Sequence, residues 1–330
     1  MAPITARDRV RAAMRGEVLD RRPFAVWRHF YAEEQPDRAG ALAHRLVEFV
    51  RRHDLDLLKY NPRAQYHGEP WGTRYRYEDE GPPTPVRYAV ADPSGWRAIS
   101  ALPPRGGVFD EMIGGLEIAR DKLPDVPLLM TIFTPLAILE RLAGKERTLA
   151  DLRERPAEVL AAMLAVTETF SRFAERCVDA GADGIFLATT EWARRDVLRD
   201  DEYAEFGRPY DLAILAAVEH AWCNVLHVCG PDARVLELSD YPVAAISWNT
   251  HASATPSPSA FLAEVPDRVG IGGLSDAAVA GGSTLEAEIA RLPRERWIAA
   301  GGCTIPPGTP AAGIDRAREL LADRTRIRTR

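Results

Sequence analysis

The sequence predicts an α/β protein built as a single (β/α)8 TIM barrel. Short apolar runs typical of buried strands alternate eight times with longer stretches of helical spacing, which is the pattern of βα units around a parallel sheet. A length of 330 residues suits one such barrel with insertions. Closure is favoured because a closed barrel has no sheet edge to protect. We therefore expect one domain over residues 1–330.

The predicted strands are short apolar runs bounded by polar or turn residues. In chain order they are Phe24–Arg28, Leu55–Tyr60, Leu128–Phe133, Gly184–Ala188, Asn224–Val228, Val243–Ser247, Val269–Gly273 and Trp297–Gly301. Apolar residues three and four apart predict the helices between them. These are Ala41–Arg52, Pro135–Ala143, Pro156–Ala180, Glu202–Ala221, Ala233–Leu238, Ser257–Ala263, Leu285–Leu292 and Pro310–Ala322.

One connection, residues 61–127, is much longer than the others. It contains Arg74-Tyr-Arg-Tyr-Glu and Val86-Arg-Tyr-Ala-Val, separated by Gly81-Pro-Pro, which predicts a hairpin. Because the segment follows the second strand, it belongs to a βα loop, and such loops lie on the catalytic face of a barrel. We expect this insertion to cover the mouth of the site.

Composition and charge narrow the class of protein. With 46% apolar and 27% charged residues the chain is globular, and 42 basic against 48 acidic residues leave a net charge of −6, which disfavours nucleic acid as a partner. No apolar signal core and no apolar stretch of roughly 18 residues is present, so we expect no membrane contact. Four irregularly spaced cysteines suit free thiols in a reducing, cytoplasmic setting.

The sharpest motif is Leu226-His227-Val228-Cys229-Gly230. Side chains two apart on a strand share a face, so one strand end presents an imidazole and a thiol together. After the last strand comes Gly301-Gly302-Cys303-Thr304, and parallel strands would bring Cys303 to the same mouth. Such a set suits zinc with a fourth position open. The alternative is that both cysteines are small core residues and His227 is a hydrogen-bonded barrel residue.

Other polar residues follow predicted strands. Glu191 is a candidate to orient His227, to accept a proton or to act as an exchangeable fourth ligand; the alternative is an acid that complements a helix dipole. Lys59, Asn61 and Arg63 are candidates to hold an anionic group, unless Arg63 is paired with Glu69. Four further candidates at predicted strand ends are Arg28, Asn249, His251 and Asp276.

Several segments together resemble the uroporphyrinogen decarboxylase superfamily over nearly the whole chain. They are Pro23-Phe-Ala-Val-Trp-Arg28, Ala182-Asp-Gly-Ile-Phe, His227-Val-Cys-Gly, Gly272-Gly-Leu and Gly301-Gly-Cys-Thr-Ile-Pro-Pro-Gly-Thr-Pro. The resemblance implies one TIM barrel. The superfamily includes cofactor-free decarboxylases, zinc methyltransferases that move a methyl group from a corrinoid to a thiol, and, more distantly, cobalamin-independent methionine synthases.

The sequence departs from the decarboxylases at one motif. Where those enzymes carry an arginine-rich R-Q-A-G-R segment for a polycarboxylate, this chain has Arg28-His29-Phe30-Tyr31-Ala32-Glu33-Glu34, with one arginine and two acids. The pattern H-x-C with a distant G-G-C matches the zinc methyltransferases. The resemblance therefore implies one Zn²⁺ per chain on His227, Cys229 and Cys303, which would deprotonate a bound thiol.

Three functional hypotheses follow. The first is a zinc-dependent methyltransferase acting on a small thiol, with a methyl donor that is either small or a corrinoid on a partner protein, since the chain lacks a D-x-H-x-x-G segment. The second is a metal-free decarboxylase or lyase that uses Arg28, Arg63 and Lys59 on a carboxylated substrate. The third is a catalytically silent binding subunit. The oligomeric state, a homodimer included, is left open.

Overall fold

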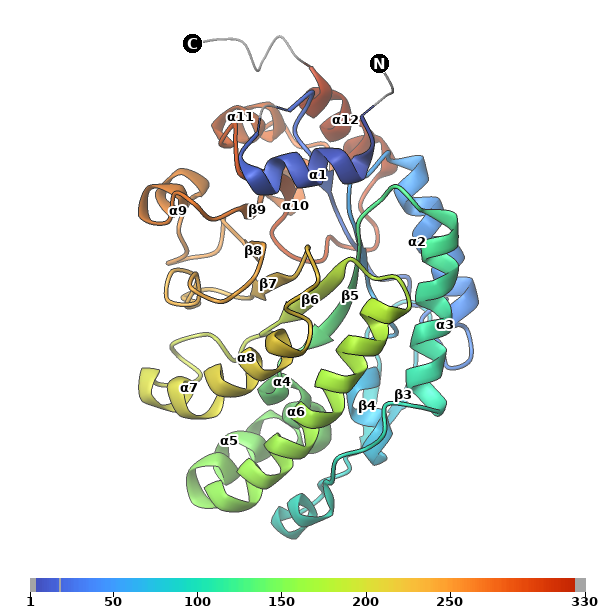
Figure 1. Ribbon diagram of the computed structural model, residues 1–330, viewed down its shortest axis with the longest axis vertical. Coiled ribbons are helices and arrows are strands. Elements are labelled where there is room, and N and C mark those ends of the chain that lie inside the picture. The colour runs from blue at the N-terminus through green and yellow to red at the C-terminus, as the bar shows by residue number, and fades with distance from the viewer. Residues whose placement is uncertain (1–3, 18, 324–330) are drawn as a thin grey trace.

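The computed structural model describes residues 4–17 and 19–323 of the chain. Its centre is a parallel sheet of eight strands in the order β1, β10, β9, β8, β7, β6, β5, β2, curled into a nearly closed barrel (Figure 1). The strands are β1 (Phe24–Ala25), β2 (Leu58–Tyr60), β5 (Leu128–Phe133), β6 (Gly184–Ala188), β7 (Val225–Val228), β8 (Ala245–Trp248), β9 (Gly270–Leu274) and β10 (Trp297–Gly301). The prediction of a TIM barrel is confirmed, and predicted strand ends differ from these by three residues at most.

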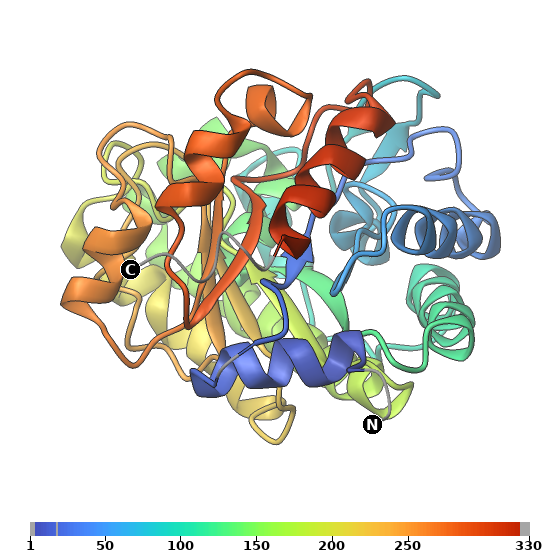
Figure 2. The ribbon, with the colours of Figure 1, turned by 90° about the horizontal axis from the view of Figure 1, so that it is seen from above.

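Helices surround the barrel, and Figures 1 and 2 show α2 and α3 lying side by side against it. None of the helices among the described residues is both long and apolar enough to cross a membrane. The α-helices are α1 (Ala6–Arg15), α2 (Ala39–Arg52), α3 (Gly107–Lys122), α4 (Pro135–Ala143), α5 (Lys145–Glu154), α6 (Pro156–Asp179), α7 (Asp200–Phe206), α8 (Arg208–Ala217), α9 (Pro258–Glu264), α10 (Asp276–Val279), α11 (Leu285–Arg291) and α12 (Ala311–Ala322).

Two predicted helices are wrong. The single helix expected over 202–221 is divided into α7 and α8 at Gly207, because Pro209 in the first turn of α8 has no N–H to continue the bonding of α7. The helix expected over 233–238 is a series of turns, and a six-residue segment is too short to be stable as a helix by itself. Helices α1, α3, α5 and α10 were not predicted; α1 begins at a capping box formed by Thr5 and Asp8.

Alternation along the strands divides the core into two layers. On β10, Ile298 and Ala300 belong to the cluster inside the barrel, whereas Trp297 and Ala299 pack outward beneath the helices. The inner cluster also contains Val10 of α1, which crosses one end of the barrel (Figure 1). The strand pattern thus fills the barrel at the end that α1 covers and leaves the C-terminal ends of the strands for the site.

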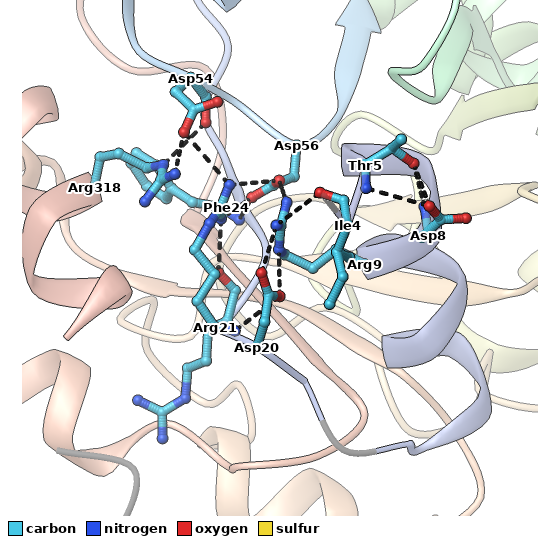
Figure 3. A network of polar contacts seen from close by, with 11 residues as sticks. Ile4, Thr5, Asp8, Arg9, Asp20, Arg21, Phe24, Asp54, Asp56 and Arg318 are labelled. Carbon is cyan, nitrogen blue, oxygen red and sulfur yellow. Dashed lines mark hydrogen bonds and ion pairs between the residues drawn. The ribbon is translucent and has the colours of Figure 1, made fainter. Parts of the chain in front are cut away.

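The seam between β1 and β2 is closed by a carboxylate and not by a strand ladder. Asp56 donates its backbone N–H to Phe24 O at 2.8 Å, and its Oδ2 accepts the Phe24 N–H at 2.8 Å. Arg9 and Arg21 both donate to the same buried carboxylate (Figure 3). Asp56 therefore replaces the missing ladder bonds at the N-terminal end of the barrel.

The insertion after β2 contains the predicted hairpin, formed by β3 (Arg74–Arg76) and antiparallel β4 (Thr84–Arg87). It also holds two 3-10 helices, η1 (Tyr66–Trp71) and η2 (Pro93–Ala98), and the unpredicted α3. Because α3 packs against α2, the insertion supplies the helix that the second βα unit otherwise lacks.

Candidate metal centre and its cavity

Three side chains from two barrel strands converge at the C-terminal end of the barrel. His227 is on β7, Cys229 follows two residues later, and Cys303 lies two residues after β10. Their ligand atoms all lie within 4.8 Å of one another. Gly302 makes this possible, because a Cβ at that position would lie 2.5 Å from the side chain of Asn249. The predicted convergence of the three residues is therefore present.

His227 is held in one orientation by its neighbours. Its Nδ1 lies 3.1 Å from Ser247 Oγ, and its ring stacks on Phe186 with centroids 5.3 Å apart. Nε2 is buried and has no hydrogen-bond partner among the residues that the structure describes. An orphaned imidazole nitrogen beside two sulfurs is the arrangement that a metal ligand set requires. The residues present thus fit a zinc ion.

The two cysteines shift each other's pKa. Hydrogen bonding with Cys229, together with the nearby His227, holds the pKa of Cys303 well below its usual range. Donating that bond, together with burial, raises the pKa of Cys229. Because the thiolate is the form of cysteine that binds a metal, the lowered pKa of Cys303 favours its use as a ligand.

A cavity of about 370 Å³ opens over this group. More than half of its lining residues are polar or charged, and aromatic and aliphatic side chains supply most of the rest. Pro82 at the tip of the hairpin lines it, so the insertion lies at the mouth as the sequence predicted. Thr190, also in the wall, has a left-handed φ of 48°, which is strained for a β-branched residue and typical of functional loops.

Residues 5–323 match the protein family described as uroporphyrinogen decarboxylase (URO-D). The chain belongs to the uroporphyrinogen decarboxylase family. No curated protein matches it by sequence.

Solved structures share the fold of this family member. One similar structure is a methyltransferase from Methanosarcina mazei, with a TM-score of 0.82 and 19% identity, covering 97% of this chain and 100% of that one. Another is a B12-independent methionine synthase from Shewanella sp. in complex with selenomethionine, with a TM-score of 0.53 and 11% identity, covering 93% of this chain and 96% of that one. At these identities the likeness concerns the fold.

A cationic side chain, Lys59, lines the cavity together with the two cysteines. It is buried, lies over the ring of Phe186 at 4.8 Å and donates to Asn61 Oδ1. Burial lowers the pKa of Lys59 to about 8, and the charges of Cys303, Glu34 and Cys229 oppose that shift. Lys59 and Asn61 both line the cavity.

Glu191 also lines the cavity, but it does not orient His227, whose Nδ1 contacts Ser247. Its carboxylate accepts a hydrogen bond from Lys145 at 2.5 Å. It is not among the three residues whose ligand atoms cluster. The expectation that it orients the histidine is therefore wrong, and a role in proton transfer stays a prediction.

Arg63 lines the cavity and is also paired with Glu69, so the two interpretations of this residue hold together. Its Nη2 lies 2.9 Å from Glu69 and 2.9 Å from Glu111, while Nε and Nη1 have no partner within the described part of the chain. Two of its donors are thus left for another group.

Arg28 lies outside this cavity, and the expectation that it acts beside Lys59 and Arg63 is wrong. Strand β1 ends at Ala25, and the chain then turns so that Arg28 lies over Phe30 and Phe49 and donates to Pro307 O at 2.8 Å. It lines a separate cavity between α2 and α12.

Three other candidates also miss the cavity wall. Asn249 packs under the loop that carries Cys303, and His251 Nε2 lies 3.2 Å from Gly273 O. Asp276 is close enough to Cys303 for the two charges to interact, which raises the pKa of Asp276 in addition to burial. None of the three lines the cavity around the sulfurs.

Among the cavity residues that the sequence analysis missed are His67 of η1 and Arg141 of α4. Neither lies at a strand end, so strand periodicity gave no signal for them. His67 reaches the cavity because its ring stacks on Phe133 at the end of β5, with centroids 4.1 Å apart.

Proposed function

We propose that the protein is a zinc-dependent methyltransferase that moves a methyl group to or from a small thiol. The observation that supports this best is the cluster of His227, Cys229 and Cys303 with the buried, unpartnered Nε2. Three ligands of this kind would hold one Zn²⁺ per chain and leave a fourth position facing the cavity.

A zinc ion with two thiolate ligands would bind a substrate thiol as its thiolate and keep that sulfur nucleophilic. Ser247 would hold the His227 ring in the ligating orientation. Glu191, at the cavity wall, would accept the proton that the thiol loses, and Lys145 would stabilise the carboxylate meanwhile. The methyl group would then transfer between the sulfur and the donor at the mouth.

The methyl donor enters on the side that the hairpin covers. Both a small donor and a corrinoid carried by a partner protein are compatible with a site that opens beside Pro82. The displacement of Arg28 into another cavity counts against the metal-free decarboxylase, because that hypothesis needs it beside Lys59 and Arg63. The M. mazei structure, a methyltransferase by its description, agrees with the proposal.

Elemental analysis tests this function most directly. Protein purified without a chelator or a metal-binding tag should contain about one zinc per chain. Thiols should then be methylated from methylcobalamin, the probe donor, in a zinc-dependent reaction. Absence of zinc from protein refilled with Zn²⁺ and dialysed would overturn the proposal, as would zinc binding without any thiol turnover.

A further inference from the structure

Another polar group lies in the cavity wall on the side of β2 and β5. It consists of Arg63, Gln65, His67 and Arg141, and each has a buried nitrogen or oxygen with no hydrogen-bond partner among the described residues. Gln65 also has a left-handed φ of 68°. Unpartnered groups are uncommon in folded proteins, and four in one wall indicate a place for a ligand.

His67 is fixed as a hydrogen-bond donor. The backbone N–H of Phe133 donates to its Nε2 at 3.0 Å, so in the neutral ring the proton is on Nδ1. Burial lowers the pKa of His67, and the charges of Arg141 and Lys59 lower it further, so the ring stays neutral near pH 7. The buried Nδ1–H has no acceptor in the described structure.

Arg63 and Arg141 each have hydrogen-bond donors that are not used within the described part of the protein. Arg63 uses Nη2 for Glu69 and Glu111, and Arg141 pairs with Glu140 at 2.5 Å. The Nε of each remains unpartnered within the described residues. Their own charges are balanced by these acids, so what they offer a ligand is hydrogen bonds.

The uncompensated charge comes from Lys59. No carboxylate forms an ion pair with it in the described ranges, and its hydrogen bond goes to the Asn61 amide. Its Nζ lies over the rings of Phe186 and Trp27, and Lys59 lines the same cavity as His67 and the two cysteines. A donor wall with one free cation matches a ligand group that has acceptor oxygens and one negative charge.

We propose that Arg63, His67 and Arg141 bind a carboxylate of the substrate, with Lys59 balancing its charge. The proposal rests on the proposed function only in taking that substrate to be a thiol, which makes it a short mercapto acid. The carboxylate would contact the β2–β5 wall while the sulfur reaches Cys229 and Cys303.

The test compares two methylated, product-like ligands that need no metal: 3-(methylthio)propanoate and its uncharged isostere 3-(methylthio)propanamide. Both are titrated by ligand-observed NMR into metal-free protein. The acid should bind at least about tenfold more tightly than the amide, because charged hydrogen bonds are lost with the amide.

Two substitutions of His67 separate its nitrogens. His67→Gln keeps an acceptor for the Phe133 N–H but places no donor at the Nδ1 position, and should lose the preference for the acid. His67→Asn places an amide N–H near Nδ1 and should keep most of it. Lys59→Met should also abolish the preference, and His44→Gln on exposed α2 is the matched control.

Each outcome decides the matter. Equal binding of acid and amide, no binding of the acid, or an unchanged preference in a folded His67→Gln protein overturns the carboxylate site. If His67→Gln does not fold, Lys59→Met carries the same decision. The protein could also bind the acid more tightly than the amide but neither bind zinc nor methylate thiols. That result would support the carboxylate site and refute only the methyltransferase function.

Discussion

Asp56 at the N-terminal end of the barrel and two histidines at the C-terminal end differ in whether their hydrogen bonds are satisfied. At the N-terminal end, both oxygens of Asp56 are occupied by Arg9, Arg21 and the Phe24 N–H (Figure 3). At the C-terminal end, His227 and His67 each leave a ring nitrogen without a partner among the described residues. Buried polar groups with hydrogen-bond partners stabilise a fold. Buried polar groups without partners lower its stability, and they are retained where a ligand supplies the missing hydrogen bond. The Asp56 cluster thus stabilises the closure of the barrel, whereas the histidines have ring nitrogens that a ligand could bind.

The largest effect is expected for Cys303→Ala at the C-terminal end, which should change metal binding and leave the stability of the fold nearly unchanged. Its zinc content should fall from about one per chain to almost none, and thiol methylation with it, because two ligands do not hold the ion. Urea unfolding of the metal-free proteins should show little change. The matched control is Cys223→Ala, a buried cysteine inside the barrel, which should keep its zinc. Global unfolding of the Cys303 variant would instead assign that residue to the fold.

Asp56→Ala tests the N-terminal end and should do the reverse. Removing the carboxylate takes the main partner of buried Arg21 and one of the two acidic partners of Arg9, at a cost of about 3–5 kcal/mol in the free energy of unfolding. Urea denaturation measures this loss, and the zinc content of the folded fraction should be unchanged. Glu17→Ala, which breaks an exposed pair with Arg15, is the control and should have little effect. Equal stability of the Asp56 and Glu17 variants would contradict the seam's role.

A smaller effect is expected from Ser247→Ala, which removes the partner of His227 Nδ1 without touching a ligand atom. Zinc affinity should fall about 10–100-fold, because the imidazole loses its fixed orientation. Competition with a chelator measures the affinity. Ser239→Ala, a buried serine bonded to Leu236 O, should leave it unchanged. An unaltered affinity in the Ser247 variant would show that packing on Phe186 alone orients the ring.

Shortening the hairpin tip at Gly81-Pro82-Pro83 should lower turnover or donor affinity severalfold while zinc content stays constant. The reason is that Pro82 lines the cavity, whereas the metal candidates are on other strands. Steady-state kinetics alongside metal analysis separates the two quantities. A parallel loss of zinc and turnover would show that the hairpin supports the ligand set itself.

Whether the position of a residue could be predicted from the sequence depends on whether local periodicity or packing between distant segments determines that position. Strand periodicity placed His227 and Cys229 on one face, and parallel strands brought Cys303 to the same end, so the convergence of these three metal candidates could be predicted from the sequence. The prediction for Arg28 was wrong because β1 ends at Ala25. Beyond that residue the chain is not a strand, so the alternation of side chains along a strand does not predict where Arg28 points.

His67 and Arg141 could not be found in this way. Their places in the cavity depend on how the insertion after β2 packs against β5 and α4, which is a long-range contact with no periodic signal. The closure of the seam by Asp56 is of the same kind, since its partners come from α1 and from the residues before β1. Local pattern thus predicted the barrel and the metal candidates, and long-range packing decided the rest.

A second buried carboxylate differs from Asp56, because no cation among the described residues forms an ion pair with it. Asp211 of α8 accepts hydrogen bonds from Tyr203 at 2.8 Å and from Tyr241 at 3.1 Å through one oxygen. Burial raises the pKa of Asp211 to about 7, although both tyrosine bonds oppose the shift. Neutral donors therefore do not hold this carboxylate ionised as arginines would.

The sign of the resulting pH dependence follows from the raised pKa. Between about pH 4 and pH 7 the folded protein keeps a proton on Asp211 that the unfolded chain has lost, so stability from this group falls as the pH rises. The loss should not exceed about 1.4 kcal/mol between pH 6 and pH 7. Asp211→Asn keeps an acceptor for both tyrosines and removes the titration. Its free energy of unfolding should therefore depend less on pH than that of the wild type in urea titrations over this range, and parallel profiles would show that Asp211 is ionised in the folded protein.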